Sequence, residues 1–309
     1  STPSNNIVFF GASQATVTGG NSSTLSVTVP YGAAYQYISV TDAVTKFTAY
    51  SSKPFIVTYP TTSVGNFNDF AVAMNVGLGS GTPNTFNQQV IKDFNGDGKP
   101  DIVVGTTTGL YLLTNQTTAG SSAISFTAQA ISLSLNIQAL AGDDLDGDGK
   151  PDLALNPTSG LLLVYKNVSA VGGSISFSSV SLPALGNTSF YSVAINDIDG
   201  DGRPDVVMGA NGGTAVYIYR NTSVSGTIYF DPFVGGYPTG SSSAIALAIG
   251  DIDGDGKPDL VTANYTVSSN LSVMRNTTAG PGNISFATAV NFSSASYNYS
   301  RSLALGDFN

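Results

Sequence analysis

The stretch Asp93-Phe-Asn-Gly-Asp-Gly-Lys-Pro-Asp101 recurs along the chain and sets the organisation of its fold. Three further complete copies occupy 144–152, 197–205 and 251–259, and a fifth begins at Asp307-Phe308-Asn309. The copies start 51 to 56 residues apart. This period is close to the roughly 40–50 residues of a four-stranded propeller blade. The chain is therefore predicted to be a repeat protein with one such loop in each unit.

Short stretches of alternating apolar and polar residues surround every loop. They precede it at 191–196 and 244–250, and they follow it at 102–105 and 206–209. A third stretch occurs at 110–114, 161–166, 215–220 and 271–275, and a fourth opens at 124–126, 175–177, 228–230 and 284–286. Runs rich in β-branched and aromatic residues between turn residues are typical of strands. Each unit is predicted to hold four short strands, and no segment has a helical pattern.

The absent residue types constrain the chemistry. The 309 residues include no Cys, His, Trp or Glu, so all 20 acidic residues are Asp. Disulfides, thiolate sites, Ser-His-Asp arrangements and zinc sites of His and Cys are excluded. Acid–base work would fall to Asp, Lys or Tyr. Acids outside the loops are few, and Asp42, Asp69 and Asp231 are the candidates. We therefore expect that the chain is not an enzyme.

The surface composition points to a location outside the cell. Charged residues make up 10% of the chain, against about 25% in soluble domains. Ser, Thr, Asn and Gly replace them, as is common in secreted β-proteins. With 11 Lys plus Arg and a net charge of −9, no basic patch is expected for nucleic acid. No apolar run is long enough to span a bilayer, and the opening 1–4 is interpreted as a mature or trimmed start.

The loop acids predict a metal. Sixteen of the 20 Asp lie in the loops, counting Asp307, and like charges crowded on a short stretch repel unless a cation neutralises them. Side-chain oxygens at loop positions 1, 3, 5 and 9, with the carbonyl of position 7, resemble a shortened EF-hand calcium loop. Glycines at positions 4 and 6 can turn the backbone around an ion, and Pro at position 8 stiffens the exit. The loops are thus predicted to bind about four Ca²⁺, one in each complete copy.

The candidate ligands follow from these positions. The residue at position 7 is expected to offer its carbonyl and to point its side chain to water. In chain order the candidates are Asp93, Asn95, Asp97, Lys99, Asp101, Asp144, Asp146, Asp148, Lys150, Asp152, Asp197, Asp199, Asp201, Arg203, Asp205, Asp251, Asp253, Asp255, Lys257, Asp259, Asp307 and Asn309. Polar hairpin turns are one alternative, because Asp-Gly is common in them. Magnesium is another, although it prefers a tighter site and keeps its waters.

The pattern D-[FIL]-[DN]-G-D-G-[KR]-P-D-[ILV] resembles the FG-GAP/VCBS repeat family, which forms the calcium-loop blades of integrin α-chain propellers and of large microbial surface proteins. The resemblance covers about residues 64–309. It implies β-propeller-type blades with calcium at Asp93, Asn95, Asp97 and Asp101 and at the matching positions of the later loops.

Residues 1–60 lack the repeat and form a separate predicted domain. Pro30 and Pro54 mark strand ends, and the predicted strands are 6–10, 14–18, 24–30, 35–41, 43–50 and 54–59. The strand pattern and the stretch Asn6-Ile-Val-Phe-Phe-Gly-Ala12 resemble an IPT/TIG domain, which implies an immunoglobulin-like β-sandwich. The boundary is predicted at 61–63. The fold class is therefore all-β, with an Ig-like sandwich followed by propeller-type blades.

The sequence contains eleven Asn-X-Ser/Thr sequons, which are potential glycosylation sites. They begin at Asn21, Asn115, Asn167, Asn187, Asn221, Asn264, Asn270, Asn276, Asn283, Asn291 and Asn298. They indicate either surface glycosylation or duplication of one turn, because four of them hold equivalent positions in successive repeats. Asp143, next to the second loop, is either an additional ligand or a solvated acid.

These features favour a non-enzymatic, calcium-stabilised structural or adhesive module of the cell surface. Its expected partners are further copies of itself, other surface proteins or glycans, as in a fibre, tube or sheath. The alternative is a lectin-like or targeting module of a secreted polysaccharide-active protein, in which Tyr237, Tyr297 and Tyr299 would stack on sugars rather than pack. The incomplete fifth loop and the missing first sandwich strand indicate either a fragment of a longer chain or completion by a strand of another copy.

Overall fold

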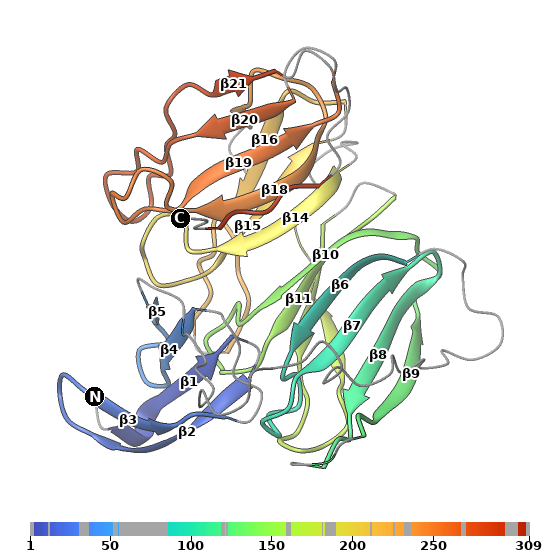
Figure 1. Ribbon diagram of the computed structural model, residues 1–309, viewed down its shortest axis with the longest axis vertical. Helices are drawn as coiled ribbons and strands as arrows, with labels where there is room; N and C mark the ends of the chain where they lie inside the picture. The colour runs from blue at the N-terminus through green and yellow to red at the C-terminus, as the bar shows by residue number, and fades with distance from the viewer. Residues whose placement is uncertain are drawn as a thin grey trace, which may run out of the picture.

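A computed structural model describes residues 3–11, 13–30, 37–51, 55, 86–118, 121, 123–158, 162–180, 182, 190–210, 212–224, 226–231, 236–266, 270–293 and 302–306. The fold is all-β, with one five-stranded and four four-stranded antiparallel sheets (Figure 1). Within these residues the only helix is the 3-10 turn η1 (Pro3–Asn5). None of the described helical structure is long and apolar enough to cross a membrane.

Each repeat forms one sheet whose strands neighbour one another in chain order. Antiparallel neighbours need only short turns between them. The strands are β6 (Phe86–Lys92), β7 (Asp101–Thr106), β8 (Gly109–Asn115) and β9 (Phe126–Ser132); β10 (Ile137–Asp143), β11 (Asp152–Pro157), β12 (Leu163–Asn167) and β13 (Phe177–Val180); β14 (Phe190–Asn196), β15 (Asp205–Ala210), β16 (Ala215–Tyr219) and β17 (Tyr237–Pro238); β18 (Ala244–Gly250), β19 (Asp259–Asn264), β20 (Leu271–Met274) and β21 (Val290–Phe292).

The first three strands of each sheet match the predicted stretches, and the fourth strand differs in the last two repeats. The segments opening at 228–230 and 284–286 form only isolated bridges, Asn221 with Phe230 and Asn276 with Phe286. The outer strands of these sheets lie further along the chain, at β17 and β21. The segment between the third and fourth strands is therefore longer in the last two repeats than in the first two.

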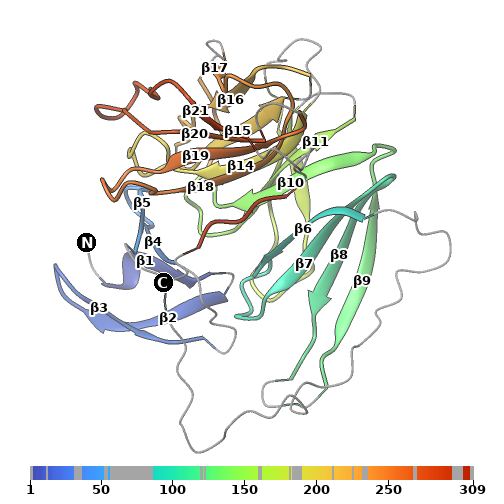
Figure 2. The same ribbon diagram turned by 45° about the horizontal axis from the view of Figure 1, so that its top comes forward.

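Successive sheets contact one another through their first strands. β6 contacts β10, β10 contacts β14, and β14 contacts β18 (Figures 1 and 2). The described segment 302–306 lies against β18, where the Leu305 side chain is 3.1 Å from the position of a Cβ on Gly250. First strands placed side by side are the arrangement expected of successive propeller-type blades.

The hydrophobic cores lie between adjacent sheets. One core joins Leu145 and Val164 of the second repeat to Val206 and Met208 of the third. Equivalent cores join the first repeat to the second and the third to the fourth. In these cores β11, β15 and β19 are buried along their whole length. Because a single sheet cannot bury both faces, the stability of each repeat depends on its neighbours.

An asparagine after the third strand connects neighbouring sheets. The Asn221 Nδ2 group donates to the Leu145 carbonyl of the preceding repeat and to the Pro204 carbonyl, both at 2.8 Å. Its Oδ1 accepts from the Ser223 N–H at 2.9 Å. Asn167 and Asn276 bond the preceding repeat in the same way, through the carbonyls of Phe94 and Ile198.

These asparagines decide part of the sequon question. Asn221 is fully buried and its Nδ2, the atom that would carry a glycan, already donates twice. A glycan on Nδ2 of Asn167, Asn221 or Asn276 would therefore replace hydrogen bonds that the folded state makes. Six described sequon asparagines are buried and three are exposed, while Asn187 and Asn298 lie outside the described residues; the buried ones are Asn115, Asn167, Asn221, Asn264, Asn270 and Asn276, and the exposed ones Asn21, Asn283 and Asn291.

The N-terminal segment forms the sheet β3-β2-β1-β4-β5. Its strands are β1 (Asn6–Phe10), β2 (Ser13–Gly20), β3 (Leu25–Thr28), β4 (Ile38–Asp42) and β5 (Thr48–Tyr50). β2 pairs with β1 along its first half and with β3 along its second, with a bulge between Val17 and Gly19. Val8, Phe10 and Ala15 form a small core to which β3, β4 and Phe55 contribute. In the predicted strand 54–59 only Phe55 is described, as an isolated bridge residue, and the predicted boundary at 61–63 lies outside the described residues.

Loss of the connecting asparagine should destabilise the protein. Asn221→Ala removes the donor to two buried carbonyls, and each buried group left unpaired costs about 1–3 kcal/mol. Asn115 is the matched control, because its Nδ2 donates to Pro100 of its own repeat and to no other repeat among the described residues. Urea unfolding should therefore show Asn221→Ala to be less stable than Asn115→Ala by about 1 kcal/mol or more. Equal losses would contradict a role in joining the sheets.

Candidate metal centres

The four complete loops join the first strand of each sheet to the second and share one backbone conformation. Glycines at loop positions 4 and 6 have positive φ in every copy, for example 74° at Gly200 and 84° at Gly202. L-residues rarely adopt these angles. The glycine spacing therefore fixes the turn, as predicted from the sequence.

The aspartate at position 1 organises the inside of the turn. In the third loop Asp197 Oδ1 accepts from the N–H groups of Gly200 and Asp201 at 2.9 and 3.1 Å, and its Oδ2 accepts from Gly202 at 2.9 Å. Asp93, Asp144 and Asp251 repeat these three bonds. These three hydrogen bonds hold the loop backbone in a turn around the position-1 carboxylate.

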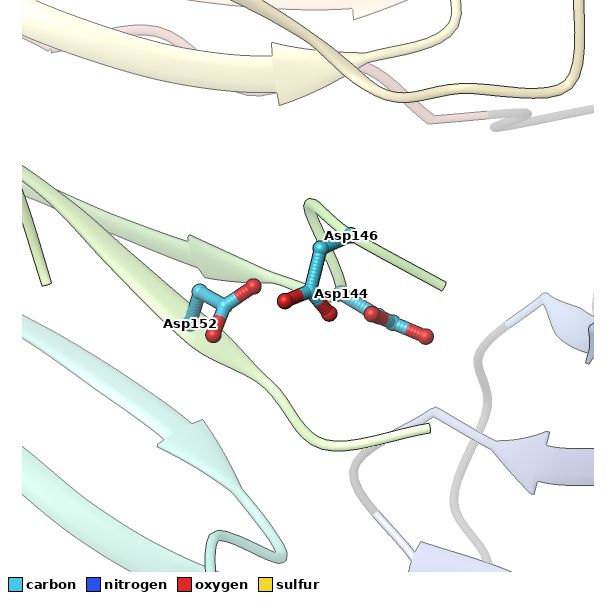
Figure 3. Close-up of side chains that lie close together, drawn as sticks. All are labelled: Asp144, Asp146 and Asp152. Carbon is cyan, nitrogen blue, oxygen red and sulfur yellow. The ribbon is translucent and has the colours of Figure 1, made fainter. Parts of the chain in front are cut away.

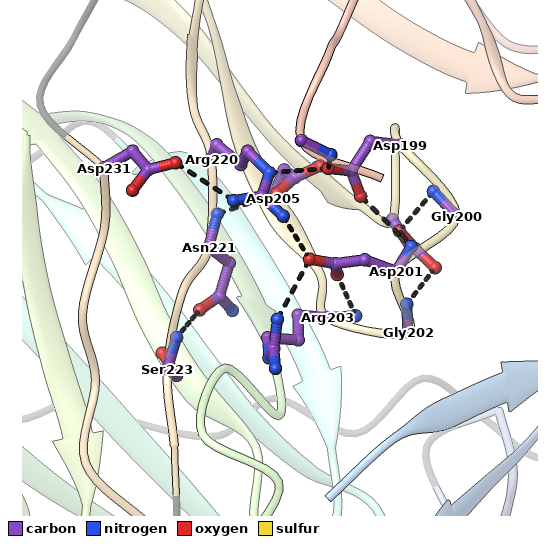
Figure 4. Close-up of polar contacts among 12 residues, drawn as sticks. Asp199, Gly200, Asp201, Gly202, Arg203, Asp205, Arg220, Asn221, Ser223 and Asp231 are labelled. Atoms are coloured by element: carbon purple, nitrogen blue, oxygen red, sulfur yellow. Dashed lines mark hydrogen bonds and ion pairs between the residues drawn. The ribbon is translucent and has the colours of Figure 1, made fainter. Parts of the chain in front are cut away.

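The aspartate at position 9 connects the loop to the sheet (Figure 4). Asp205 is fully buried at the start of β15. Its Oδ2 accepts from the Ile198 N–H at 3.0 Å, and its Oδ1 accepts from the Asn221 N–H at 2.8 Å. Asp101, Asp152 and Asp259 make equivalent pairs of bonds. One carboxylate therefore ties the loop, the second strand and the end of the third strand together.

The loop acids converge in space. In three loops a carboxylate oxygen from each of three aspartates lies within 4.8 Å of the others, and Figure 3 shows the group of the second loop. The groups are Asp144, Asp146 and Asp152; Asp197, Asp199 and Asp205; and Asp251, Asp253 and Asp255. The second and third loops thus bring together positions 1, 3 and 9, and the fourth brings together positions 1, 3 and 5.

The first loop has an amide in place of one acid. Asn95 occupies position 3 and is buried, as are Asp93 and Asp101. Burial, opposed by backbone N–H bonds, raises the pKa of Asp93, and the neighbouring Asp97 raises it further. The predicted residues of the fifth loop, Asp307 and Asn309, lie outside the described residues.

Three of the loop carboxylates, Asp101, Asp144 and Asp197, have pKa values well above the usual range of an aspartate. Burial raises the pKa of Asp144 to about 7, and the charges of Asp148 and Asp146 add to the rise. Burial is also the largest cause that raises the pKa of Asp101 and of Asp197 to about 6. Backbone N–H bonds oppose these rises without cancelling them. Crowded, buried carboxylates of this kind are favourable when a cation shares their charge.

The repeat region matches a known family of repeats. A model of the FG-GAP-like repeat matches residues 93–155, 144–208, 197–262 and 251–309. The chain belongs to the FG-GAP-like repeat family. Each match begins at one of the four complete loops, so the loop that organises the sequence also defines the family. The FG-GAP resemblance is thus confirmed, and the VCBS and IPT/TIG resemblances stay predictions.

Two solved structures are similar at low sequence identity. An Agrocybe aegerita lectin with specific recognition of non-reducing terminal N-acetylglucosamine is 14% identical, with a TM-score of 0.43 over 98% of this chain and 76% of the lectin. Bacillus licheniformis rhamnogalacturonan lyase is 14% identical, with a TM-score of 0.38 over 92% of this chain and 62% of the lyase, so this chain spans less than two thirds of it. No curated protein matches the chain.

The donor set of the FG-GAP-like loops fits a hard cation. The converging atoms are carboxylate and amide oxygens, the ligands that calcium prefers. Three loops present oxygens close enough to share one ion. The side chains at position 7 differ from the expectation in two loops, because Lys99 and Arg203 fold back onto the position-5 acids Asp97 and Asp201, at 3.4 and 3.0 Å, instead of pointing to water.

The N-terminal sheet packs on the FG-GAP-like loops. The Thr48 N–H donates to the Gly202 carbonyl of the third loop at 2.9 Å. The guanidinium of Arg203 lies 5.5 Å from the centre of the Phe47 ring. At the second loop, Ile7 Cδ1 is 2.4 Å from the position that a Cβ on Gly149 would take. This docking was not predictable from the sequence, because its contacts join residues that lie far apart in the chain.

The next repeat covers each of the first three loops. A glycine in the hairpin after its third strand donates to the residue at loop position 3: Gly172 to the Asn95 carbonyl, Gly226 to the Asp146 carbonyl and Gly282 to Asp199 Oδ2. The fourth loop has neither cover within the described residues, and residues 251–256 are exposed. The first three FG-GAP-like loops are therefore shielded from water and the fourth is open.

The described acids outside the loops, Asp42, Asp143 and Asp231, are engaged in structural contacts. Asp143 pairs with Lys92 at 3.4 Å and bonds Tyr50 of the N-terminal sheet, so it is more than a solvated acid. Two-fifths of the Tyr50 side chain is exposed, yet burial of its hydroxyl end and the nearby carboxylates hold its pKa well above the usual value. Asp42 accepts from the Val44 and Thr45 N–H groups, Asp231 pairs with Arg220, and Asp69 lies outside the described residues.

The features suggested for sugar binding are also engaged. Tyr237 donates its hydroxyl to the Ile284 carbonyl and packs edge-on against Phe286, while Tyr297 and Tyr299 lie outside the described residues. A surface hollow of about 510 Å³ beside the third loop is lined by Phe47, Gly200, Asp201, Gly202, Arg203, Arg220 and Pro281. Its charged groups already pair with one another, so the hollow offers few unengaged groups for a sugar.

A comparison of two glycines at the same loop position can distinguish the cost of backbone strain in the loop from the cost of disturbing the N-terminal sheet. Gly149 and Gly256 have φ of 86° and 85°, but a Cβ on Gly149 would meet Ile7 whereas one on Gly256 would meet nothing within 4 Å. Alanine at either position costs about 1–2 kcal/mol of backbone strain. Gly149→Ala should cost more, because it also displaces the N-terminal sheet. Matched chemical denaturation curves that gave the same loss for both variants would rule out this packing.

Metal-free protein should lose stability as the pH rises. Asp101 and Asp197 have folded pKa values of about 6 and Asp144 of about 7, all above the roughly 3.9 of an unfolded chain. The folded state therefore holds more protons between these values, so its stability is full below about pH 4 and is lost as the pH rises through about 6 to 7. Thermal melts of dialysed protein from pH 4 to 8 test this. A metal-free melting temperature that rises over this interval would contradict it.

Proposed function

We propose that this protein is a non-enzymatic, calcium-stabilised structural or adhesive module. The observation that carries the proposal is the repeated convergence of aspartate oxygens in the loops that connect the first and second strands. A cation bound there lowers the repulsion within the loop and thereby strengthens the links to both strands. An ion that binds only the native state stabilises folding by mass action.

The proposed ligands are the predicted side chains at loop positions 1, 3, 5 and 9 with the carbonyl at position 7, one calcium for each complete loop. Calcium accepts six to eight oxygens in flexible geometry. Magnesium requires a tighter octahedral shell and retains several waters. A loop that offers four side chains and a carbonyl suits calcium better. What calcium supplies when bound is charge neutralisation, and the chain's own residues supply the closed loop and its attachment to the sheets.

A structural role agrees with how the remaining polar groups are used. The described acids outside the loops hold turns or join the N-terminal sheet to the repeats. FG-GAP-like repeats stack units whose cores lie between neighbours. We therefore propose that calcium sets the rigidity of an extracellular surface protein, a subunit of a fibre, tube or sheath, with residues 1–60 as an IPT/TIG-type domain and about 64–309 as the repeat domain.

Calcium removal should lower the stability of the protein substantially. Dialysed protein is expected to melt at lower temperature than protein in excess calcium, because each ion adds RT ln(1 + [L]/Kd) to the native state, about 2.7 kcal/mol at a hundredfold excess over Kd. Calorimetry and limited proteolysis at the loops would measure this, with magnesium as the control ion. If verified calcium-loaded and calcium-free samples melt together, the proposed function is wrong.

A further inference from the structure

The residue just before the connecting asparagine differs among the repeats in step with loop position 3. In the second, third and fourth repeats it is basic: Lys166, Arg220 and Arg275. In the same repeats position 3 is Asp146, Asp199 and Asp253. In the first repeat the two positions are Thr114 and Asn95. An acid at position 3 thus occurs with a cation, and an amide occurs without one.

The structure explains this pairing. In the third repeat Arg220 Nε lies 2.6 Å from Asp199 Oδ2, while Asp199 Oδ1 accepts from the Asp201 N–H at 3.1 Å inside the loop. The outer carboxylate oxygen is therefore held by the guanidinium and by the Gly282 N–H at 2.7 Å, and the inner oxygen faces the loop (Figure 4). The Asp199 side chain has no exposed surface, and Arg220 is 20% exposed.

In the second and fourth repeats too, the basic side chain approaches the Oδ2 atom of the position-3 aspartate and the Oδ1 atom faces the loop. Lys166 Nζ bonds Asp146 Oδ2, and Asp146 Oδ1 accepts from the loop N–H of Asp148 at 3.2 Å. Arg275 lies 3.6 Å from Asp253 Oδ2 in the exposed fourth loop. In the first loop the outer atom is already a donor, and the Asn95 Nδ2 group donates to the Gly173 carbonyl at 3.4 Å.

We propose that Lys166, Arg220 and Arg275 are built-in counter-charges that hold the position-3 carboxylate to a single inward oxygen. The four FG-GAP-like loops then present the same ligand charge. Counting only the loop carboxylates and the strand-end residue, the first loop has three carboxylates, a charge of −3, and each of the others has four carboxylates and one cation, also −3. The cations of the second and third repeats also reach the position-5 acids Asp148 and Asp201, and Arg220 pairs with Asp231 as well. These basic residues are positioning residues, since they act through the aspartate. The inference rests on the proposed calcium role, although the ion pair itself acts in the metal-free chain.

This arrangement separates two energetic consequences. Without metal, loss of the cation leaves a buried carboxylate beside like charges, so the folded state is destabilised. With metal, the same loss leaves the loop more negative, so its attraction for a divalent ion rises. A basic side chain that merely packed would lower stability equally in both conditions. The opposite responses therefore identify a counter-charge.

The second loop gives the sharpest test, because replacing its pair copies the natural pair of the first loop. The variants are Lys166→Thr, Asp146→Asn and the double variant. In dialysed protein Lys166→Thr should lower the melting temperature by about 5 °C, and the double variant should recover most of that loss. In calcium titrations Lys166→Thr should bind about tenfold more tightly at one site, with a larger calcium-induced rise in melting temperature, and the double variant should return to the parent value.

Matched variants keep the test decisive if Lys166→Thr does not fold. Lys166→Arg keeps the charge and should melt like the parent. In the first loop Asn95→Asp should destabilise the dialysed protein, and adding Thr114→Arg should restore it. No rescue by Asp146→Asn or by Thr114→Arg would overturn the counter-charge. If rescue occurs in dialysed protein but calcium stabilises no variant, the counter-charge stands and the proposed calcium function fails.

Discussion

The whole repeat depends on the buried aspartate at loop position 9. Asp205 accepts one N–H from its own loop and one from Asn221 at the end of the third strand. Asn221 in turn bonds the loop of the preceding repeat. A chain of hydrogen bonds therefore runs from loop to loop through carboxylate and amide, and each loop is a structural part of the sheet that follows it.

The carboxylates that close each loop also repel one another, and this repulsion destabilises the closed loop. Every loop surrounds its turn with carboxylates, and burial raises the pKa of Asp144 and of Asp197 in two of the covered loops. Backbone N–H groups, strand-end cations and, in the proposed function, calcium each offset part of this repulsion. The cover from the next repeat and from the N-terminal sheet strengthens all of these interactions, because exclusion of water lowers the local dielectric constant.

Features that depend on short spacing could be predicted from the sequence, and features that depend on long-range contacts could not. Loop glycines such as Gly200 and Gly202 require a positive φ by local sterics, so their turn followed directly from the motif. The docking of Phe47 on Arg203 joins residues more than a hundred positions apart and left no periodic signal. Asn221 and Arg220 were visible as recurring positions, but their partners lie in other parts of the fold.

The connecting asparagines carry a consequence for how the protein can be made. Asn167, Asn221 and Asn276 each begin an Asn-X-Ser/Thr sequence, and a secretory pathway that attaches glycans to nascent chains reads that sequence before the sheets form. A sugar placed on Nδ2 at that moment would leave no room for the link to the preceding repeat. Synthesis in a cell without such an enzyme preserves these amides, whereas a glycan attached to them would break the links between repeats.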